Sequence, residues 1–424
     1  MGATSMVVTG ARLADGSVRD FAVVDGRIAE VSDADGSAER VDAAGLVALP
    51  GLVDLHTHLR EPGKEDAETI ASGTLAAARG GYTAVFAMPN LDPATDTAEA
   101  AQYVAEVGRR DGHCDVVPIG AVTKGRDGVE LAELGLMAEH GVRVFSDDGA
   151  CVHDSLIMRR ALTYLKTYDG VLAQHAQDPR LAGPSACCHE SEISGRLGLP
   201  AWPTIAESTI IARDVQIAEF TGGRYHACHI STAESVDVIR WAKKRGKAQV
   251  TAEVTPHHLL LDTPHVESYD TTFKVNPPLV TNEHIEALRE ALVDGTIDIV
   301  GTDHAPHTVE DKDHPFEVAS PGMLALEAAL AVVMELFVTT GRMDWAGVVD
   351  RMSAAPARIG RLPHQGRPLA VGEPANLVLV DPTRRATVDR AASASKSRNN
   401  PYHGLDLPDP VEMTVWAGKV TYRR

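Results

Sequence analysis

The chain has 424 residues and a formal net charge of -19 at pH 7. Hydrophobic residues make up 44% and charged residues 23%, which are the proportions of a folded globular protein rather than a disordered or fibrous one. Such an acidic surface repels phosphate backbones and anionic lipids, so no nucleic acid and no membrane is expected as a partner. The five cysteines are irregularly spaced and no signal-like segment opens the chain. We therefore expect a cytoplasmic protein without disulfides.

Short apolar runs alternate with helical patterns through the middle of the chain. The runs are 52–56, 83–88, 115–122, 142–145, 170–175, 224–229, 249–254 and 297–302. The segments between them are long enough for crossover helices, for example at 66–79, 207–220 and 235–245. Eight strand-helix units predict an α/β fold, specifically a (β/α)8 TIM-like barrel. The apolar stretch 323–337, which Glu327 and Glu335 interrupt, predicts a core-facing helix rather than a membrane span.

The two ends of the chain have a different pattern. Residues 6–48 contain short strand-like pieces with Asp-Gly pairs at 15–16, 25–26 and 35–36, and such pairs favour hairpins. Residues 371–380 and 411–422 are also strand-like, with no room for crossover helices. We predict a small β-domain formed by residues 1–50 and 365–424, beside a barrel of residues 51–364. The small, polar segment 391–397 is expected to be a loop or strap between them.

Five of the predicted strands end in residue types that bind metal ions, and barrel enzymes place their active sites at these strand ends. Residues two apart on a strand share a face, so the side chains of His56 and His58 can point in the same direction. Imidazoles and carboxylates in this number suit two divalent ions, with zinc the best match. A lone histidine at a strand end is more often structural, but six suitable residues favour a metal site. The candidates are His56, His58, Asp148, His175, His229 and Asp303. Asp147 is the alternative to Asp148 as a metal-bridging carboxylate. Adjacent strand residues face opposite ways, so only one of the two is expected to reach the site.

Several motifs carry a resemblance to a known family. Residues 49–58, LPGLVDLHTH, resemble the signature at the start of amidohydrolase superfamily barrels. HLREPG at 58–63, AMPN at 87–90, FSDDG at 145–149 and GTDHAPH at 301–307 are similar to the bacterial class I dihydroorotases, and the similarity runs on to SKSRN at 395–399. The resemblance implies that His56, His58 and Asp303 hold one zinc ion, that His175 and His229 hold another, and that Asp148 bridges them. Many superfamily members bridge with a carboxylated lysine, but residues 142–148 contain Arg143 and no lysine.

The resemblance also implies a reaction, the reversible cyclisation of N-carbamoyl-L-aspartate to L-dihydroorotate in pyrimidine biosynthesis. Metal-bound hydroxide would be the nucleophile and Asp303 the general acid and base. Arg60 follows His58 by two positions, so its guanidinium can grip a substrate carboxylate near the metals. The substrate contacts implied by the family are His58, Arg60, Asn90, Asn276, His307 and the backbone of Pro321 and Gly322. The long charged loop 304–322 is expected to close over the substrate and to be mobile without it.

Two other functions fit parts of the pattern. A hydantoinase or dihydropyrimidinase would use the same barrel and metals, but usually with the modified lysine and without a carboxylate clamp. A non-catalytic scaffold homologue would be expected to have lost metal ligands, and all six are present. His257 and His258 are expected to line the pocket or support a loop, and Cys228 to pack in the core. A homodimer and an association with aspartate transcarbamoylase are partner expectations that the sequence leaves open.

Overall fold

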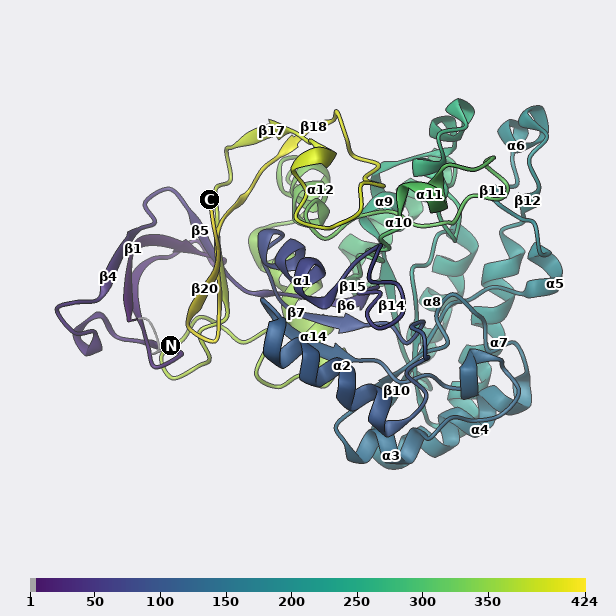
Figure 1. The fold of residues 1–424 in the computed structure, drawn as a ribbon, viewed down its shortest axis with the longest axis horizontal. Helices are drawn as coiled ribbons and strands as arrows, with labels where there is room; N and C mark the ends of the chain where they lie inside the picture. Colours follow the sequence, from purple (N-terminus) through teal and green to yellow (C-terminus); the bar gives the residue numbers. More distant parts are fainter. Residues whose placement is uncertain (1–4) are drawn as a thin grey trace.

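The computed structural model describes residues 5–424, which form a barrel and a smaller β-sheet part beside it (Figure 1). Within these residues, eight strands pair in parallel around the barrel. They are β6 (Leu52–Thr57), β7 (Tyr82–Ala87), β8 (Asp115–Pro118), β9 (Val144–Phe145), β10 (Val171–Gln174), β13 (Arg224–Ala227), β14 (Gln249–Val254) and β15 (Ile299–Val300). The predicted (β/α)8 barrel is confirmed, although several strands are shorter than the apolar runs that predicted them.

Two short contacts close the ring of strands. A parallel bridge between Gly120 and Phe145 joins the end of β8 to β9. A second bridge, between Thr57 and His304, joins β6 to the segment that follows β15. The strands therefore form a closed barrel, and the ends of β6 and β15 lie side by side.

A buried carboxylate fastens this second junction. Asp54, which is fully buried on β6, accepts hydrogen bonds from the Thr302 backbone N–H at 2.8 Å and the Thr302 hydroxyl at 2.6 Å. The Thr57 hydroxyl also donates to Asp54. Burial raises the pKa of Asp54 to about 6, and the hydroxyl donors limit that rise. Hydrogen bonds from both strands thus stabilise the carboxylate where the barrel closes.

Helices surround the barrel and connect its strands (Figure 1). Several begin at a Thr or Asp whose side chain accepts a backbone N–H, as Thr69, Thr97, Asp154 and Thr232 do. The longer helices are α1 (Ile70–Arg79), α2 (Ala98–Asp111), α4 (Ser155–Leu165), α7 (Ile205–Thr221), α8 (Ala233–Arg245) and α10 (Asn282–Asp294). The shorter ones are α3 (Leu134–Glu139), α5 (Pro179–Ala182), α6 (Glu192–Leu197), α9 (Pro256–Leu260), α11 (Val309–Lys312), α12 (Ala329–Val333), α13 (Trp345–Val349) and α14 (Ala355–Ile359). The three helices expected at 66–79, 207–220 and 235–245 are present as α1, α7 and α8.

The helix predicted over 323–337 starts later than the apolar pattern suggested. α12 begins at Ala329 and continues into a π-helical turn, Met334–Val338. Met323 instead pairs with His304, and the N–H groups of Ala325 and Leu326 donate to the His304 ring. The prediction was wrong for these first residues because they take part in the barrel closure. In the described part of the chain, no helix is long and apolar enough to cross a membrane.

Both ends of the chain contribute to one eight-stranded sheet, as predicted. Its strands are β1 (Met6–Leu13), β2 (Val18–Val24), β3 (Arg27–Ala29), β4 (Glu39–Asp42), β5 (Val47–Pro50), β16 (Leu377–Val380), β19 (Val411–Trp416) and β20 (Lys419–Arg423). The order is β20-β19-β16-β5-β1-β2-β3, with β4 paired to β1. Two small ribbons accompany these parts, β11 (Cys188–His189) with β12 (Ala201–Trp202), and β17 (Arg385–Thr387) with β18 (Asp406–Pro408). The predicted domain starts at residue 1, and residues 1–4 lie outside the described residues.

Two of the three Asp-Gly pairs make the predicted hairpins. Gly16 (φ 84°) lies between β1 and β2, and Gly26 (φ 77°) lies between β2 and β3. The pair at 35–36 does not, because it leads into β4, which runs parallel to β1. That third hairpin prediction was wrong.

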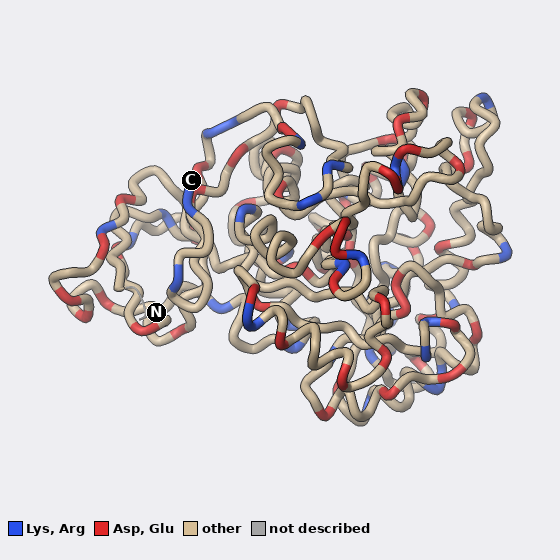
Figure 2. The backbone as a smooth tube through the Cα atoms, viewed as in Figure 1, with Lys and Arg blue, Asp and Glu red and all other residues tan. Residues whose placement is uncertain are grey.

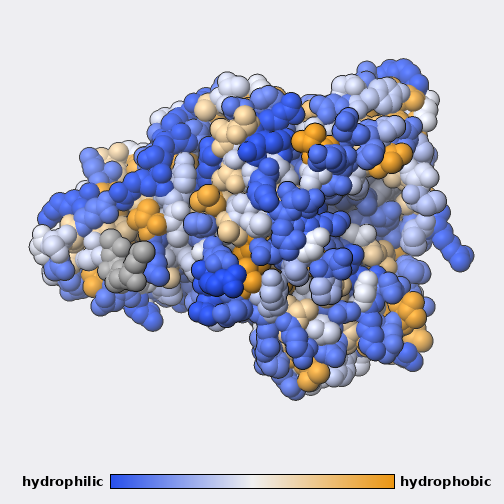
Figure 3. Space-filling view, viewed as in Figure 1, coloured by the Kyte–Doolittle hydropathy of each residue, from blue (hydrophilic) through white to orange (hydrophobic). Residues whose placement is uncertain are grey.

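The surface is mainly hydrophilic and its charges are dispersed. Acidic residues occur throughout both parts of the chain with basic residues between them (Figure 2). On the face shown in Figure 3, apolar residues form small groups separated by hydrophilic ones. The dispersed charge and small apolar groups match the expectation of a folded, acidic globular protein.

The predicted strap between the two parts packs on the start of α1. Glu68, which is fully buried, accepts hydrogen bonds from the Ser395 hydroxyl and, at 3.2 Å, from the Lys396 backbone N–H. The Ser397 hydroxyl donates to the Ala67 carbonyl at 2.7 Å. One buried glutamate therefore anchors the strap to the barrel.

Replacing this carboxylate should destabilise the protein. We expect Glu68→Gln to lower the free energy of unfolding by about 1–3 kcal/mol, because buried donors of the strap lose a charged acceptor. Urea denaturation measures the change, with the exposed Glu290→Gln as the control. Equal stability of the two variants would show that the strap does not depend on Glu68.

Candidate metal centre and substrate pocket

The six predicted metal ligands lie together at the C-terminal end of the barrel. All of them are at least 95% buried. His56 is on β6 and His58 directly follows it, while the others follow β9, β10, β13 and β15 in turn. The barrel brings together Asp148, His175, His229 and Asp303 from these four strand ends.

Asp148 lies at the centre of this cluster. Its Oδ1 atom is 3.4 Å from His56 Nε2, 3.5 Å from His229 Nε2 and 3.8 Å from His175 Nδ1. Its Oδ2 atom is 3.4 Å from His58 Nε2. One carboxylate thus faces all four imidazoles, which is the arrangement that a bridging ligand requires.

Its neighbour Asp147 faces away from the cluster. The Asp147 carboxylate accepts the backbone N–H groups of Val122 and Thr123 at 2.8 and 3.0 Å, and the Thr123 hydroxyl at 2.5 Å. Arg143, the basic residue of segment 142–148, donates to the backbone carbonyls of Ala138 and Val142. Asp147 is thus a structural residue of the β8 end.

Asp303 completes the cluster next to His56 and His58. Its Oδ1 atom is 3.0 Å from His58 Nε2 and 3.5 Å from His56 Nε2. Burial alone would raise the pKa of Asp303, but the charge of His56 and the hydrogen bond with His58 hold that pKa below its usual value. The carboxylate is therefore kept anionic, as a metal ligand must be.

The donor set fits divalent cations. Asp148 Oδ1 and His56 Nε2 are buried and have no hydrogen-bond partner within residues 5–424. Two overlapping groups, His56–His58–Asp303 and His56–Asp148–His229, each place three ligand atoms within 4.8 Å of one another. Buried polar atoms without partners are uncommon in proteins, and imidazole nitrogens with carboxylate oxygens are ligands that zinc accepts.

Two of the imidazoles are oriented by side-chain amides. His58 Nδ1 is 2.8 Å from Asn90 Oδ1, and His175 Nε2 is 2.8 Å from Gln177 Oε1. The Asn276 amide donates to the same Gln177 oxygen at 3.1 Å. Gln177 was not predicted as a site residue, although its position two residues after His175 could have suggested a shared face.

His56 is oriented by a carboxylate, Glu253, which the sequence analysis also missed. Its Oε1 atom is 2.5 Å from His56 Nδ1. The available signal was a single charged residue on β14, next to the apolar residues Ala252 and Val254.

A pocket of about 260 Å³ opens onto the cluster. Every residue predicted to contact substrate lines it, namely His58, Arg60, Asn90, Asn276, His307, Pro321 and Gly322. Lys64 and Arg126 also line it, and sequence reasoning did not identify them. The pocket is therefore bordered by several cations despite the acidic surface of the chain.

Arg60 is the most deeply placed of these cations. It is 6% exposed, and its Nε donates to the Pro306 carbonyl at 3.0 Å. Burial lowers the pKa of Arg60 to about 10, so it remains charged at neutral pH. Burial, with the nearby charge of Arg60, lowers the pKa of His307 to about 3, which leaves that imidazole neutral. Arg60 is therefore the charged donor of the two, while the neutral His307 donates through Nε2 to the Pro321 carbonyl at 2.9 Å.

Gly322 gives the pocket its shape. Its φ is 145°, and a Cβ there would lie 2.8 Å from both the Ala305 Cβ and the His307 ring. Both the backbone conformation and the space therefore require glycine at this position.

Left-handed backbone is concentrated at this site. Arg60 (φ 63°), Arg126 (φ 61°), His229 (φ 26°) and Asp303 (φ 47°) all adopt it, although none is a glycine. Such conformations cost of order 1–3 kcal/mol and are typical of functional sites.

The loop 304–322 covers one side of the pocket and includes α11. The buried ammonium of Lys312 donates to the carbonyls of Thr271, Lys274 and Ser320 at 3.0, 3.3 and 2.8 Å. The Asn399 amide, two residues after the strap, donates to the Gly322 carbonyl at 3.1 Å. These bonds hold the loop against its neighbours, and its mobility and closure over substrate stay predictions.

The remaining candidates have structural positions. His258 lies between the Thr255 hydroxyl at 2.7 Å and the Pro277 carbonyl at 3.1 Å, so it supports the segment that carries Asn276. His257 is buried and does not line the pocket. Cys228 packs in an apolar core cluster, as expected.

Comparisons with known proteins identify the family of the chain. A family model described as dihydro-orotase-like matches residues 45–235. The chain is 56% identical to a dihydroorotase of Streptomyces coelicolor over 98% of this chain and 97% of the relative. It is 50% identical to a dihydroorotase of Mycobacterium tuberculosis over 99% and 98%. Among solved structures, an L-hydantoinase (dihydropyrimidinase) from Arthrobacter aurescens shares the fold at a TM-score of 0.87 and 24% identity, covering 100% of this chain and 96% of that one. The chain therefore belongs to the dihydroorotase family.

Proposed function

We propose that this chain is a zinc-dependent dihydroorotase of the cytoplasm, which interconverts N-carbamoyl-L-aspartate and L-dihydroorotate in pyrimidine biosynthesis. The observation that carries the proposal is a single carboxylate, Asp148, that faces four imidazoles. It lies beside a pocket that contains the buried guanidinium of Arg60. A cation centre next to an anion clamp suits a cyclic amide that carries a carboxylate.

Each of the six ligands has a defined place in the proposed centre. His56, His58 and Asp303 would hold one zinc ion, and His175 and His229 a second, with Asp148 bridging. When bound, zinc lowers the pKa of water to about 7 and polarises a carbonyl oxygen. His56 Nε2 and Asp148 Oδ1 are buried and have no hydrogen-bond partner in the described residues. This supports the assignment, because bound cations would give both atoms a partner.

The substrate carboxylate would bind between Arg60, Asn90 and His307. The Asn90 oxygen is engaged by His58, so its amide N–H groups are the ones available to a carboxylate. Asn276 donates to Gln177, which leaves its own oxygen for a ring N–H group. The backbone of Pro321 and Gly322 would complete the ring contacts. These residues fix the orientation of the scissile amide relative to Asp303.

Asp303 is the group that moves protons. In hydrolysis it takes a proton from the attacking water and delivers it to the departing ring nitrogen. In cyclisation it takes the proton from the attacking ureido nitrogen and delivers it to the departing carboxylate oxygen, which takes up a second proton from solvent to become water. The same carboxylate therefore serves both directions, and no covalent bond to the protein is needed.

A hydantoinase or dihydropyrimidinase is the rival function. The structural neighbours of that kind share 21–24% identity and show the fold alone. The buried Arg60 distinguishes the two functions, because a neutral cyclic ureide gives a desolvated guanidinium no anionic partner. A non-catalytic scaffold is disfavoured by the intact convergence of all six ligands.

The substrate assignment is tested directly with purified protein. We expect turnover of dihydroorotate and carbamoyl aspartate, with little hydrolysis of dihydrouracil or hydantoin. Asp303→Ala should lower kcat by about 10²–10⁴-fold, as loss of a general acid-base group does. Zinc content is measured in parallel. Protein with full zinc that hydrolyses hydantoins but not dihydroorotate would overturn the assignment.

The adjacent aspartates provide a matched test of the metal centre. We expect wild-type protein to hold two zinc ions and Asp148→Asn to lose at least one, because the amide is a poor bridging ligand. Zinc binding at 100 times its dissociation constant stabilises a protein by about 2.7 kcal/mol, so chelation should lower the Tm of wild type more than that of Asp148→Asn. Asp147→Asn should reduce stability but retain zinc. The reverse pattern would exchange the two roles.

Arg60→Lys tests the carboxylate clamp. A lysine keeps the charge but cannot make two parallel hydrogen bonds, so we expect KM for carbamoyl aspartate to rise by about 10–100-fold. Zinc content should stay unchanged, because Arg60 contacts no metal ligand in the hydrogen-bond network. An unchanged KM would place the carboxylate elsewhere in the pocket.

A further inference from the structure

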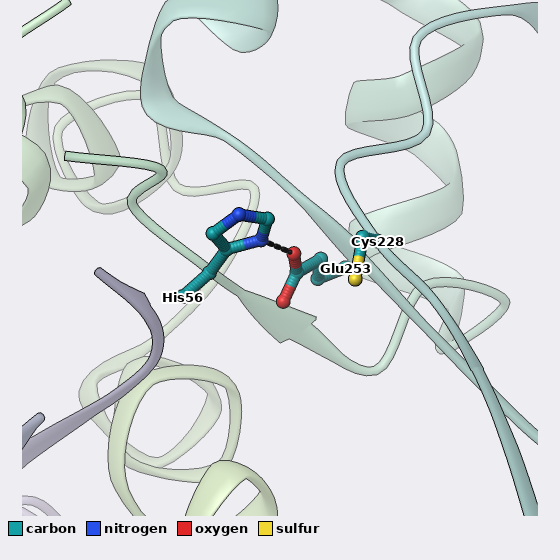
Figure 4. Close-up of side chains that lie close together, drawn as sticks. All are labelled: His56, Cys228 and Glu253. Atoms are coloured by element: carbon teal, nitrogen blue, oxygen red, sulfur yellow. Dashed lines mark hydrogen bonds and ion pairs between the residues drawn. The ribbon is translucent and has the colours of Figure 1, made fainter. Parts of the chain in front are cut away.

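Glu253 is a buried acid directly beneath the proposed metal centre. It lies on β14, is 1% exposed, and is not one of the six ligands. Glutamate is almost never fully buried unless it is paired, because removing its charge from water is costly. Glu253 therefore needs hydrogen-bond or ionic partners inside the barrel. Figure 4 shows its carboxylate directed at the His56 ring.

The two carboxylate oxygens contact both halves of the centre. Oε1 is 2.5 Å from His56 Nδ1 and accepts the backbone N–H of His229 at 3.1 Å. Oε2 is 3.1 Å from the ring of His226, whose other nitrogen is 2.8 Å from the Thr251 hydroxyl. One side chain on β14 thus connects ligands that come from β6 and from the end of β13.

The hydrogen bond to His56 decides which ring nitrogen can bind metal. Because Nδ1 carries the proton that Glu253 accepts, Nε2 is left with its lone pair. Nε2 is the atom that lies 3.4 Å from Asp148 and 3.5 Å from Asp303. The contact therefore directs the correct nitrogen of His56 at the centre.

The neighbouring strand leaves room for this carboxylate. A Cβ at Gly301 would lie 2.4 Å from Glu253 Oε2, so the carboxylate would have to move from its present position. Gly301 follows β15 and comes two residues before Asp303. The absence of a side chain at 301 thus allows Glu253 to reach beneath the cluster.

A separate metal site made of His56, Cys228 and Glu253 is the alternative use of these groups, since their ligand atoms lie within 4.8 Å of one another (Figure 4). Cys228 belongs to an apolar cluster with residues such as Val53 and Val171. Apolar surroundings disfavour the thiolate, which is the form of cysteine that binds metal. His56 Nδ1 is also already engaged by Glu253. The contacts favour an orienting role for the carboxylate over a third metal site.

We propose that Glu253 is the positioning residue of the metal centre, which fixes the tautomer of His56 and the backbone of His229 through one oxygen atom. This inference rests on the proposed zinc centre. Two zinc ions would bring four positive charges against two from Asp148 and Asp303, so a third buried carboxylate also offsets part of the remaining charge. Contacts of this kind, from a carboxylate to a metal-bound histidine, raise metal affinity.

Glu253→Gln tests the proposal, because the amide has the same shape and lacks the charge. We expect the zinc dissociation constant, measured by competition with a chromophoric chelator, to rise by about 10–100-fold. The absorption spectrum of the cobalt-substituted protein should also shift, because His56 is no longer held. Glu207→Gln is the matched control. Glu207 is 2% exposed and accepts the backbone N–H groups of Ser231 and Thr232, but it contacts no imidazole.

His226→Gln serves as a second variant if Glu253→Gln does not fold, and it should change zinc affinity in the same direction by a smaller factor. Unchanged zinc affinity and an unchanged cobalt spectrum in the folded variant would overturn the positioning role, even if its Tm falls. Equal losses of zinc affinity in Glu207→Gln would also overturn it. Failure of wild-type protein to bind zinc would instead overturn the proposed metal centre.

Discussion

The site depends on the place where the first and last barrel strands meet. Hydrogen bonds from Thr57 and Thr302 to the buried Asp54 carboxylate hold β6 and the end of β15 together. Because of this contact, His56 on β6 and His58, which follows it, lie against Asp303, which is almost 250 residues away in the sequence. Replacing Asp54 by a neutral residue would remove the acceptor for donors on both strands. The geometry of the candidate centre is thus a consequence of how the barrel closes.

The partners that orient the imidazoles differ in charge between the pocket side and the barrel interior. Asn90 orients His58 and Gln177 orients His175, and both amides also face the pocket or a residue that lines it. Glu253, by contrast, is enclosed in the barrel and reaches His56 from below. The neutral partners, Asn90 and Gln177, therefore lie on the pocket side. The charged partner, Glu253, lies in the buried interior of the barrel. This division keeps the additional negative charge away from the anion clamp around Arg60.

Much of this arrangement could be predicted from the sequence, because it follows from local pattern and motif. Polar residues at strand ends identified the six candidate ligands that the barrel brings together, and the candidate pocket residues followed from the family resemblance. The choice between Asp148 and Asp147 required the motif, since strand alternation says only that adjacent residues diverge. Glu253 could not be found in this way, because its partners lie on β6 and β13 and depend on which strands are neighbours. The late start of α12 also depends on contacts between distant segments. Met323 pairs with His304, and this pairing overrides the helical apolar pattern of the sequence.

Lys312 has a consequence for how the loop 304–322 can move. Its ammonium is bound by three backbone carbonyls, and burial lowers its pKa to about 7. An ammonium that leaves this position regains its hydration shell, which compensates for much of the lost hydrogen bonding. The three hydrogen bonds of Lys312 therefore define one position of the loop but contribute little net free energy to holding it there. Movement of the loop stays a prediction, and hydrogen bonds of this kind would add little to its free-energy barrier while still defining one closed position.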